Sequence, residues 1–257
     1  AYLEEGSIVC GRIFSYKADC VSVLGNGILY GSVWHKPDEN GGRLMAAFTL
    51  GDDIRIQGIT IVDSGVWNLV PGACRNVSIC DVNILSRLVT GDGIDIVGCE
   101  NVTIENCFIR ACDDAIAIKG MAPSTTLPSN YKPNRNLTFE RIQLWNDANN
   151  AFGLGAETQA SIYENISLKS SDILFSYDDP NHHEQLDERS AMNICALHGT
   201  YFRNILFEDI RVYRCERLIG LGFKNDFWFG SIQGNQKLPG GIEEITFRNI
   251  TSIRRQI

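Results

Sequence analysis

A short phrase of alternating apolar and polar residues recurs along the chain, and each copy begins with Asn, Asp or Glu. In such a copy, as in Val77-Ser78-Ile79, apolar residues stand two positions apart, which is the pattern of a half-buried β-strand. The copies lie at 53–56, 76–79, 101–104, 136–139, 165–168, 204–207 and 244–247. No stretch has the long 3.6-residue periodicity with capping residues that would predict a helix.

The spacing of the copies predicts how they are arranged. The first steps are 76 − 53 = 23 and 101 − 76 = 25 residues, and the later steps, counted in the same way, are 35, 29, 39 and 40. A period of this length fits a coil of about three short strands, with loops inserted into the later coils. We therefore predict an all-β chain folded as a parallel β-helix. Its inward residues should stack in columns, as in Ile56, Ile79, Ile104 and Phe139.

We expect one β-helix domain over residues 1–257. No cap is recognisable after the last copy, which leaves truncation or a partner packed over the terminal coil open. The inserted loops are expected at 121–135, 176–191 and 221–241, and loops are where function concentrates. The third carries Phe223, Phe227, Trp228 and Phe229, which either form a platform for a sugar or pack the loop down.

Five copies match the sequence pattern for N-glycosylation, at Asn76, Asn101, Asn136, Asn165 and Asn249. Because each asparagine sits at a corresponding place in the repeat, we prefer a structural explanation. Its amide group is expected to form hydrogen bonds along a turn of the coil.

Composition and charge narrow the function classes. The net charge of −8 argues against nucleic acid or an anionic membrane as the main partner. There is no apolar run long enough for a transmembrane helix and no visible secretory signal. The spacing of the nine cysteines does not form two CxxC pairs, which argues against a zinc site. Most of them are expected to be small buried side chains. A Cys107–Cys112 disulfide stays open.

Three aspartates carry the candidate chemistry. Asp92 precedes Asp113 by 113 − 92 = 21 residues, close to one coil, so it should project beside the Asp113–Asp114 pair. Repulsion among the three carboxylates should raise at least one pKa, which leaves one group able to donate a proton. Hydrolysis of a glycosidic bond needs such an acid together with an ionised carboxylate that activates water. A calcium site or turn-capping aspartates are the alternatives, and Asp95 is expected to play a structural or supporting role.

The residues in 89–120 resemble glycoside hydrolase family 28, the polygalacturonase-like family, and the related dextranase and isopullulanase family 49. The resemblance rests on Asp-Gly-Ile-Asp at 92–95, Asn-Val-Thr-Ile at 101–104 and Asp-Asp-Ala-Ile-Ala-Ile-Lys at 113–119. It implies a right-handed, pectin-lyase-like solenoid and an inverting hydrolase without a cofactor or metal. It further implies that Asp113 is the general acid, and that Asp92 and Asp114 hold and deprotonate the attacking water.

The chain departs from the polygalacturonase pattern at four places: Thr90-Gly91-Asp92 replaces Asn-Thr-Asp, Asp113-Asp114-Ala115 replaces Asp-Asp-Cys, and the other two departures remove a cation. The family's Gly-His-Gly falls at about 149–151, where the histidine is replaced by Asn150, and its Arg-Ile-Lys falls at about 193–195, which reads Asn-Ile-Cys. Without these cations a uronate carboxylate loses charge-assisted hydrogen bonds. We therefore expect a neutral or decorated glycan rather than plain polygalacturonate, and a secreted or periplasmic protein, given that class of substrate.

Further residues are candidates for contacts with the substrate, and each has a plain structural explanation as well. They are Lys119, Asn150, Glu157, Trp67 and His183, with His182 and His198 as weaker candidates. Three functions remain in competition: an inverting glycoside hydrolase, a carbohydrate-binding or adhesin β-helix without activity, and a polysaccharide lyase or epimerase.

Overall fold

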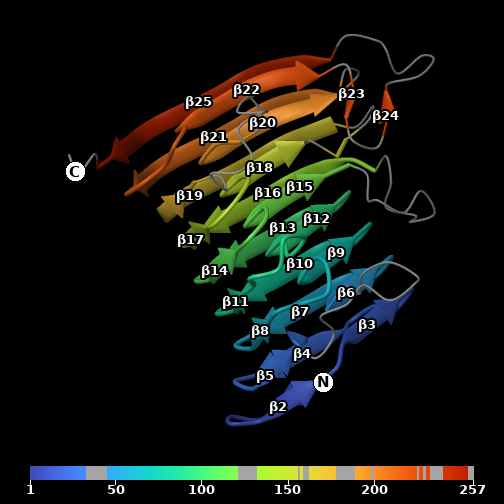
Figure 1. The fold of residues 1–257 in the computed structure, drawn as a ribbon. Coiled ribbons are helices and arrows are strands. Elements are labelled where there is room, and N and C mark those ends of the chain that lie inside the picture. The colour runs from blue at the N-terminus through green and yellow to red at the C-terminus, as the bar shows by residue number, and fades with distance from the viewer. Residues whose placement is uncertain are drawn as a thin grey trace.

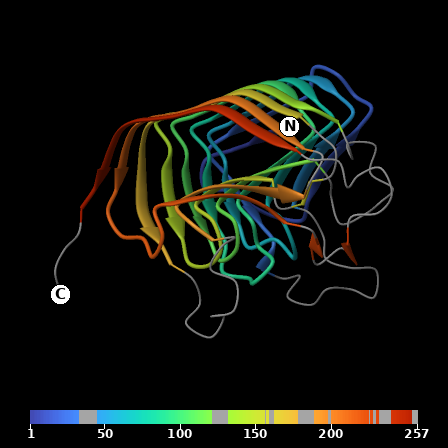
Figure 2. The same cartoon turned by 90° about the horizontal axis from the view of Figure 1, so that it is seen from above.

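The computed structural model describes residues 1–32, 45–120, 132–155, 157–158, 162–177, 189–197, 200–224, 226–227, 230–231 and 240–253. Their strands stack coil upon coil from the N-terminus to the C-terminus (Figure 1). All strand pairs along the stack are parallel, so the predicted parallel β-helix is confirmed. Seen from above, successive coils lie over one another (Figure 2).

Each coil contributes a strand to each of three faces. The first face contains β1 (Tyr2–Leu3), β4 (Ser22–Gly25), β7 (Asp52–Gln57), β10 (Arg75–Cys80), β13 (Glu100–Glu105) and β16 (Asn134–Glu140). The second contains β2 (Ile8–Cys10), β5 (Ile28–Tyr30), β8 (Thr60–Val62), β11 (Asn83–Leu85), β14 (Phe108–Ala111) and β17 (Gln143–Asn146). The third contains β3 (Ile13–Tyr16), β6 (Ala46–Thr49), β9 (Leu69–Gly72), β12 (Ile94–Val97), β15 (Ile116–Lys119), β18 (Phe152–Gly155), β20 (Met192–Leu197) and β22 (Ile219–Lys224).

In the last coils the first two faces merge. The long strands β19 (Ile162–Ser176), β21 (Tyr201–Val212) and β25 (Gly241–Ser252) pair side by side, and β19 also pairs with β16 and β17. The short strands β23 (Asp226–Phe227) and β24 (Gly230–Ser231) form an antiparallel pair outside the stack.

The predicted columns of the core are confirmed. Ile56, Ile79, Ile104 and Phe139 pair in register from coil to coil and are fully buried. Because every coil places an apolar side chain at this level, the columns form one continuous core. Phe223, predicted in the third inserted loop, lies in β22 instead. It packs against this core, and its ring centroid is 6.2 Å from that of Phe202. The side chains of Phe227, Trp228 and Phe229 lie outside the described residues.

The repeated asparagines form a ladder of side-chain amides. Nδ2 of Asn101 donates to Oδ1 of Asn76 at 3.1 Å, and Nδ2 of Asn136 donates to Oδ1 of Asn101 at 3.0 Å. The ladder runs from Asp53 to Asn204, and each member described has a positive φ, as in Asn101 at 56°. Asparagine tolerates this conformation better than most residues. The predicted hydrogen bonds along the turn are therefore confirmed, and a second ladder joins Asn249 to Asp209.

All nine cysteines lie in the described residues, and none of them is in a disulfide. The Cys107–Cys112 bridge is therefore absent. Four cysteines are buried, three are partly buried, and Cys10 and Cys20 are exposed, so the expectation that most are buried is wrong. The buried four are Cys74, Cys99, Cys107 and Cys195. In the part of the chain described, we find no helix of the length and apolar character that a membrane crossing requires.

Candidate active site

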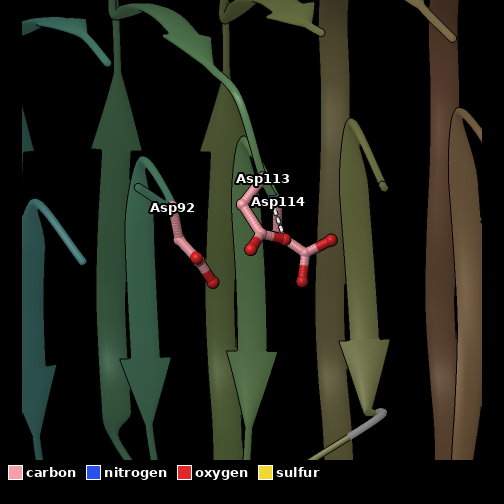
Figure 3. A group of neighbouring side chains, drawn as sticks. All are labelled: Asp92, Asp113 and Asp114. Carbon is pink, nitrogen blue, oxygen red and sulfur yellow. Dashed lines mark hydrogen bonds between the residues drawn. The ribbon is translucent and has the colours of Figure 1, made fainter. Parts of the chain in front are cut away.

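The three predicted aspartates meet where the chain passes from the second face to the third. Asp92 lies before β12, and Asp113 and Asp114 lie before β15 of the next coil. Their carboxylates point toward one another (Figure 3). One carboxylate oxygen from each residue lies within 4.8 Å of those of the other two. The structure therefore brings together the aspartates that the spacing predicted.

The register differs slightly from the one-coil offset counted from the sequence. Ile94 pairs with Ile116, so the true step is 116 − 94 = 22 residues, and Asp92 is level with Asp114 rather than with Asp113. The backbone N–H of Gly93 donates to the carbonyl of Asp114 at 2.8 Å, which fixes this alignment. A Cβ at Gly93 would come within 2.3 Å of the carbonyl oxygen of Ala115. Glycine is thus required for the two coils to approach.

Asp113 differs from its neighbours in exposure. It is partly exposed, whereas Asp92 and Asp114 are buried. Its Oδ1 accepts hydrogen bonds from the backbone N–H of Asp114 at 3.0 Å and from Nδ2 of Asn149 at 2.9 Å. Burial, followed by the charges of Asp92 and Asp114, raises the pKa of Asp113 well above its usual range. The structure therefore gives a carboxyl group whose raised pKa favours the protonated form and which is still partly exposed.

Asp114 is held by the next coil. Asn150 donates both its backbone N–H and its Nδ2 to Oδ1 of Asp114, at 3.0 and 2.9 Å. Burial raises the pKa of Asp114, and Lys119 and Asn150 act in the opposite direction. Asn150 also accepts a hydrogen bond at its Oδ1 from the backbone N–H of Ser190 at 3.0 Å. Asn150, a predicted substrate contact, is thus 3% exposed and fully engaged with its neighbours.

Asp92 is linked to Lys119, another predicted substrate contact. Nζ of Lys119 lies 2.8 Å from Oδ2 of Asp92, 2.7 Å from Oδ1 of Asp95 and 2.8 Å from Oε2 of Glu157. Burial and the neighbouring Asp95 raise the pKa of Asp92, which Lys119 opposes. Burial raises the pKa of Asp95 to about 7. The support expected of Asp95 therefore acts through Lys119.

The remaining predicted contacts lie around the same ammonium group or outside the described residues. Glu157 is buried against Lys119, and the ring centroid of Trp67 lies 3.7 Å from the Nζ of Lys119. One face of Trp67 is thus already covered, and the side chain is 5% exposed. His183 lies outside the described residues, as do His182 and His198.

Two neighbours of the carboxylates were not predicted. Asn149 binds Asp113, as described above, and the positive charge of Arg189 lowers the pKa of Asp114. Arg189 is therefore a further cation near the carboxylates, whereas Asn193 and Cys195 are neutral. The sequence contains a signal for this arrangement, because a polar residue precedes an alanine once in each of three successive coils, at Ala115, Ala151 and Ala191. In the structure the backbones of these alanines are hydrogen-bonded in register. This alignment places Arg189 beside Asn149 and Asp113.

The three aspartate carboxylates would also suit calcium, which prefers oxygen ligands. The Oδ2 atom of Asp92 already accepts a hydrogen bond from the Lys119 ammonium, however. A metal ion in contact with that oxygen would have to compete with a buried positive charge. The arrangement is better suited to moving a proton, since it sets a partly exposed carboxyl group with a raised pKa beside two buried ones.

Comparison with known proteins agrees with the predicted resemblance. Residues 30–130 match the family described as glycosyl hydrolases family 28. A probable polygalacturonase from Vitis vinifera is 29% identical over 124 residues, which cover 48% of this chain and 24% of that protein. The resemblance predicted from residues 89–120 is therefore confirmed over the part of the chain that holds the three aspartates.

Solved structures agree on the fold. A family 28 exopolygalacturonase from Yersinia enterocolitica matches with a TM-score of 0.64 and 13% identity, over 93% of this chain and 48% of that one. A hyperthermoactive exopolygalacturonase from Thermotoga maritima matches with a TM-score of 0.54 and 16% identity, over 97% and 73%. This chain thus spans about a quarter of the grape protein and about half of the Yersinia enzyme.

Proposed function

We propose that this chain carries the catalytic site of an inverting glycoside hydrolase that cleaves O-glycosidic bonds in a polysaccharide or oligosaccharide. The observation that carries the proposal is the contrast within one carboxylate cluster. Asp113 is partly exposed and favours its protonated form, and it lies beside the buried Asp92 and Asp114. The family 28 match over the same residues supports the assignment.

In this proposal Asp113 donates its proton to the oxygen of the bond that breaks. Asp92 and Asp114 hold a water molecule on the opposite side of the sugar, and one of them takes its proton as it attacks the anomeric carbon. Water thereby forms the new C–O bond on the face opposite the leaving group, which inverts the anomeric configuration. The hydrogen bonds from Asn149 and Asn150 keep Asp113 and Asp114 in place for these roles.

For the substrate, we propose a neutral or decorated glycan rather than plain polygalacturonate. Asn150 replaces the family's histidine and is engaged with Asp114, and Asn193 and Cys195 supply no charge on β20. Arg189 is a cation close to Asp114, and it offers one charged group to an acidic substituent on the glycan. We propose a secreted or periplasmic location, because polysaccharides of this class are met outside the cytoplasm.

The geometry speaks against a lyase that uses Lys119 as its base. A lyase needs a neutral basic group that can reach the sugar. Lys119 contacts three carboxylates and is buried, and their charges raise its pKa well above its usual range. An ammonium group held in this way does not accept a proton at working pH. A silent sugar-binding protein remains the alternative that activity measurements separate.

The test is a screen for released reducing ends on polygalacturonate, rhamnogalacturonan, dextran, pullulan and galactosides, with Asp113→Asn alongside. Asp53→Asn is the matched control, because Asp53 begins the ladder in which other coils carry asparagine. We expect release from one neutral or decorated glycan, with kcat lower by about 100-fold or more in Asp113→Asn and unchanged in the control. Proton NMR of the first product should show the inverted anomer.

Other outcomes contradict parts of the proposal. Release from polygalacturonate would contradict the substrate class, and a retained anomer would contradict the inverting mechanism. Sugar binding without turnover, together with calcium-dependent thermal stability, would support the silent binding protein instead.

A further inference from the structure

Lys119 lies at the centre of a buried group of charges that comes from four coils. Asp92 and Asp95 lie before and within β12, Lys119 ends β15, Glu157 follows β18, and Trp67 precedes β9. Oxygen atoms of three carboxylates lie at 2.7–2.8 Å from Nζ as ion pairs, and the oxygen of Asp92 also accepts a hydrogen bond from the ammonium. The Trp67 ring, at 3.7 Å, adds a cation–π contact. The ammonium is therefore surrounded by three carboxylates and an aromatic ring from within the protein.

This arrangement removes Lys119 from the surface. The residue is 2% exposed, and all residues of β15 are buried although β-strand alternation would turn Ala117 and Lys119 away from the core. The outer side of the third face is covered by a second apolar cluster of Trp67, Val70, Val97 and Ala47. A sugar bound over Asp113 therefore does not reach the lysine directly.

We propose that Lys119 is a positioning residue for Asp92: its ammonium fixes the rotamer of that carboxylate toward the attacking water and compensates its negative charge, while Asp95 and Glu157 hold the ammonium in place. Of the three carboxylates around Nζ, only Asp92 belongs to the cluster that includes Asp113 and Asp114. Its hydrogen bond from Lys119 occupies Oδ2, which leaves Oδ1 without that contact. The inference rests on the proposed function and assigns Lys119 a role that its predicted contact with substrate does not include.

Two carboxylates beyond Asp92 are needed for this role. A lysine paired with Asp92 alone would keep the rotational freedom of its long side chain, whereas contacts to Asp95 and Glu157 define one position for the ammonium. The buried set in contact with Nζ holds three carboxyl groups and one ammonium, so it favours keeping a proton on one of them. Asp95, whose pKa is raised to about 7, is the member that is farthest from solvent, with no exposed surface.

The experiment compares Lys119→Met with the double variant Lys119→Met/Asp95→Asn, on the glycan of the panel that the wild-type protein cleaves. Without Lys119, Asp95 is a buried carboxyl group that has lost its cation. Asparagine has the same shape and is neutral at every pH, so the double variant should restore part of the thermal stability that the single variant loses. We expect kcat to fall about 100-fold in both variants, within the range of a positioned general base, while KM changes less than about threefold. Lys17→Met, at an exposed lysine of the first coil, is the control for the substitution itself.

The outcomes of this experiment distinguish the role of Lys119 from the proposed hydrolase function. A double variant that folds and recovers kcat to within a few fold of wild type would show that Lys119 only balances charge, and would overturn its positioning role. A higher KM with unchanged kcat in either variant would make Lys119 a substrate contact. In both cases the wild-type protein still hydrolyses its glycan and the proposed function stands. No turnover by the wild-type protein would overturn the proposed function and this inference together.

Discussion

Asn150 donates two hydrogen bonds to one oxygen of Asp114, from its backbone N–H at 3.0 Å and from its Nδ2 at 2.9 Å. The same side chain accepts a hydrogen bond from Ser190 in the following coil. Asn150 therefore connects the carboxylate cluster to the coil that carries Arg189. Its place is that of the histidine in the polygalacturonase pattern, but its role here is to hold a carboxylate.

Asn150→Ala should lower kcat about 10-fold or more with little change in KM. The variant loses a side-chain hydrogen bond to a charged group, which contributes about 1.5–3 kcal/mol, and leaves the backbone N–H bond in place. Steady-state kinetics on the cleaved glycan check this, with thermal melting as the control for folding. A variant of unchanged kcat and raised KM would instead make Asn150 a direct substrate contact.

Asp113→Asn should stabilise the folded protein at neutral pH. The raised pKa of Asp113 means that the folded state binds a proton more tightly than the unfolded state. Its contribution to stability is therefore present in full below the unfolded pKa of about 4 and is lost as pH rises through the folded pKa. Asparagine stays neutral and avoids that loss.

The measurement is thermal melting of both proteins between pH 4 and pH 8. The variant's advantage should be near zero at pH 4 and grow as the pH rises toward 8, by about 1.4 kcal/mol for each unit by which folding raises the pKa. An advantage that is equal at both ends of the range would show that the pKa of Asp113 is not raised by folding.

Trp67→Leu should affect stability and kcat rather than KM. The indole is 5% exposed and covers the Lys119 ammonium, so its removal opens a cavity and weakens the group that positions Asp92. We expect a loss of about 3 kcal/mol in the free energy of unfolding, within the range for truncating a buried large side chain. Denaturant unfolding and kinetics check both effects. A several-fold rise in KM with unchanged stability would instead support the predicted sugar-stacking role.

Asn101→Ala should destabilise the protein without changing its activity. The substitution breaks the ladder bonds to Asn76 and Asn136 and places alanine at a φ of 56°. Together these changes should cost about 2–3 kcal/mol, from a left-handed residue and lost hydrogen bonds. Asn101→Gly also breaks the ladder bonds but adopts this φ without strain. Its free energy of unfolding, measured with denaturant, should therefore fall by about 1 kcal/mol less than that of Asn101→Ala. Equal losses would show that the ladder bonds account for the whole effect.

The fold could be predicted from the sequence because its information is local and repeated. Alternation at two residues defines each strand, and the return of the same phrase after one coil defines the stack, as the columns through Ile79 and Ile104 show. The same regularity placed Asp92 near Asp113 and Asp114, since the two segments are separated by one uninterrupted coil. It also explained the asparagines that match a glycosylation pattern.

The surroundings of those aspartates were decided only by the tertiary structure. Glu157 and Arg189 follow long insertions, so their register with Lys119 and Asp114 cannot be counted from the length of a coil alone. Strand alternation turns Lys119 outward, where a substrate contact is the natural expectation, but Trp67 from an earlier coil covers that side. Whether a charged side chain faces water or other buried charges depends on what packs over it. The sequence by itself therefore determined the coil and its three carboxylates, and the packing of distant coils determined which groups hold them and which one stays accessible.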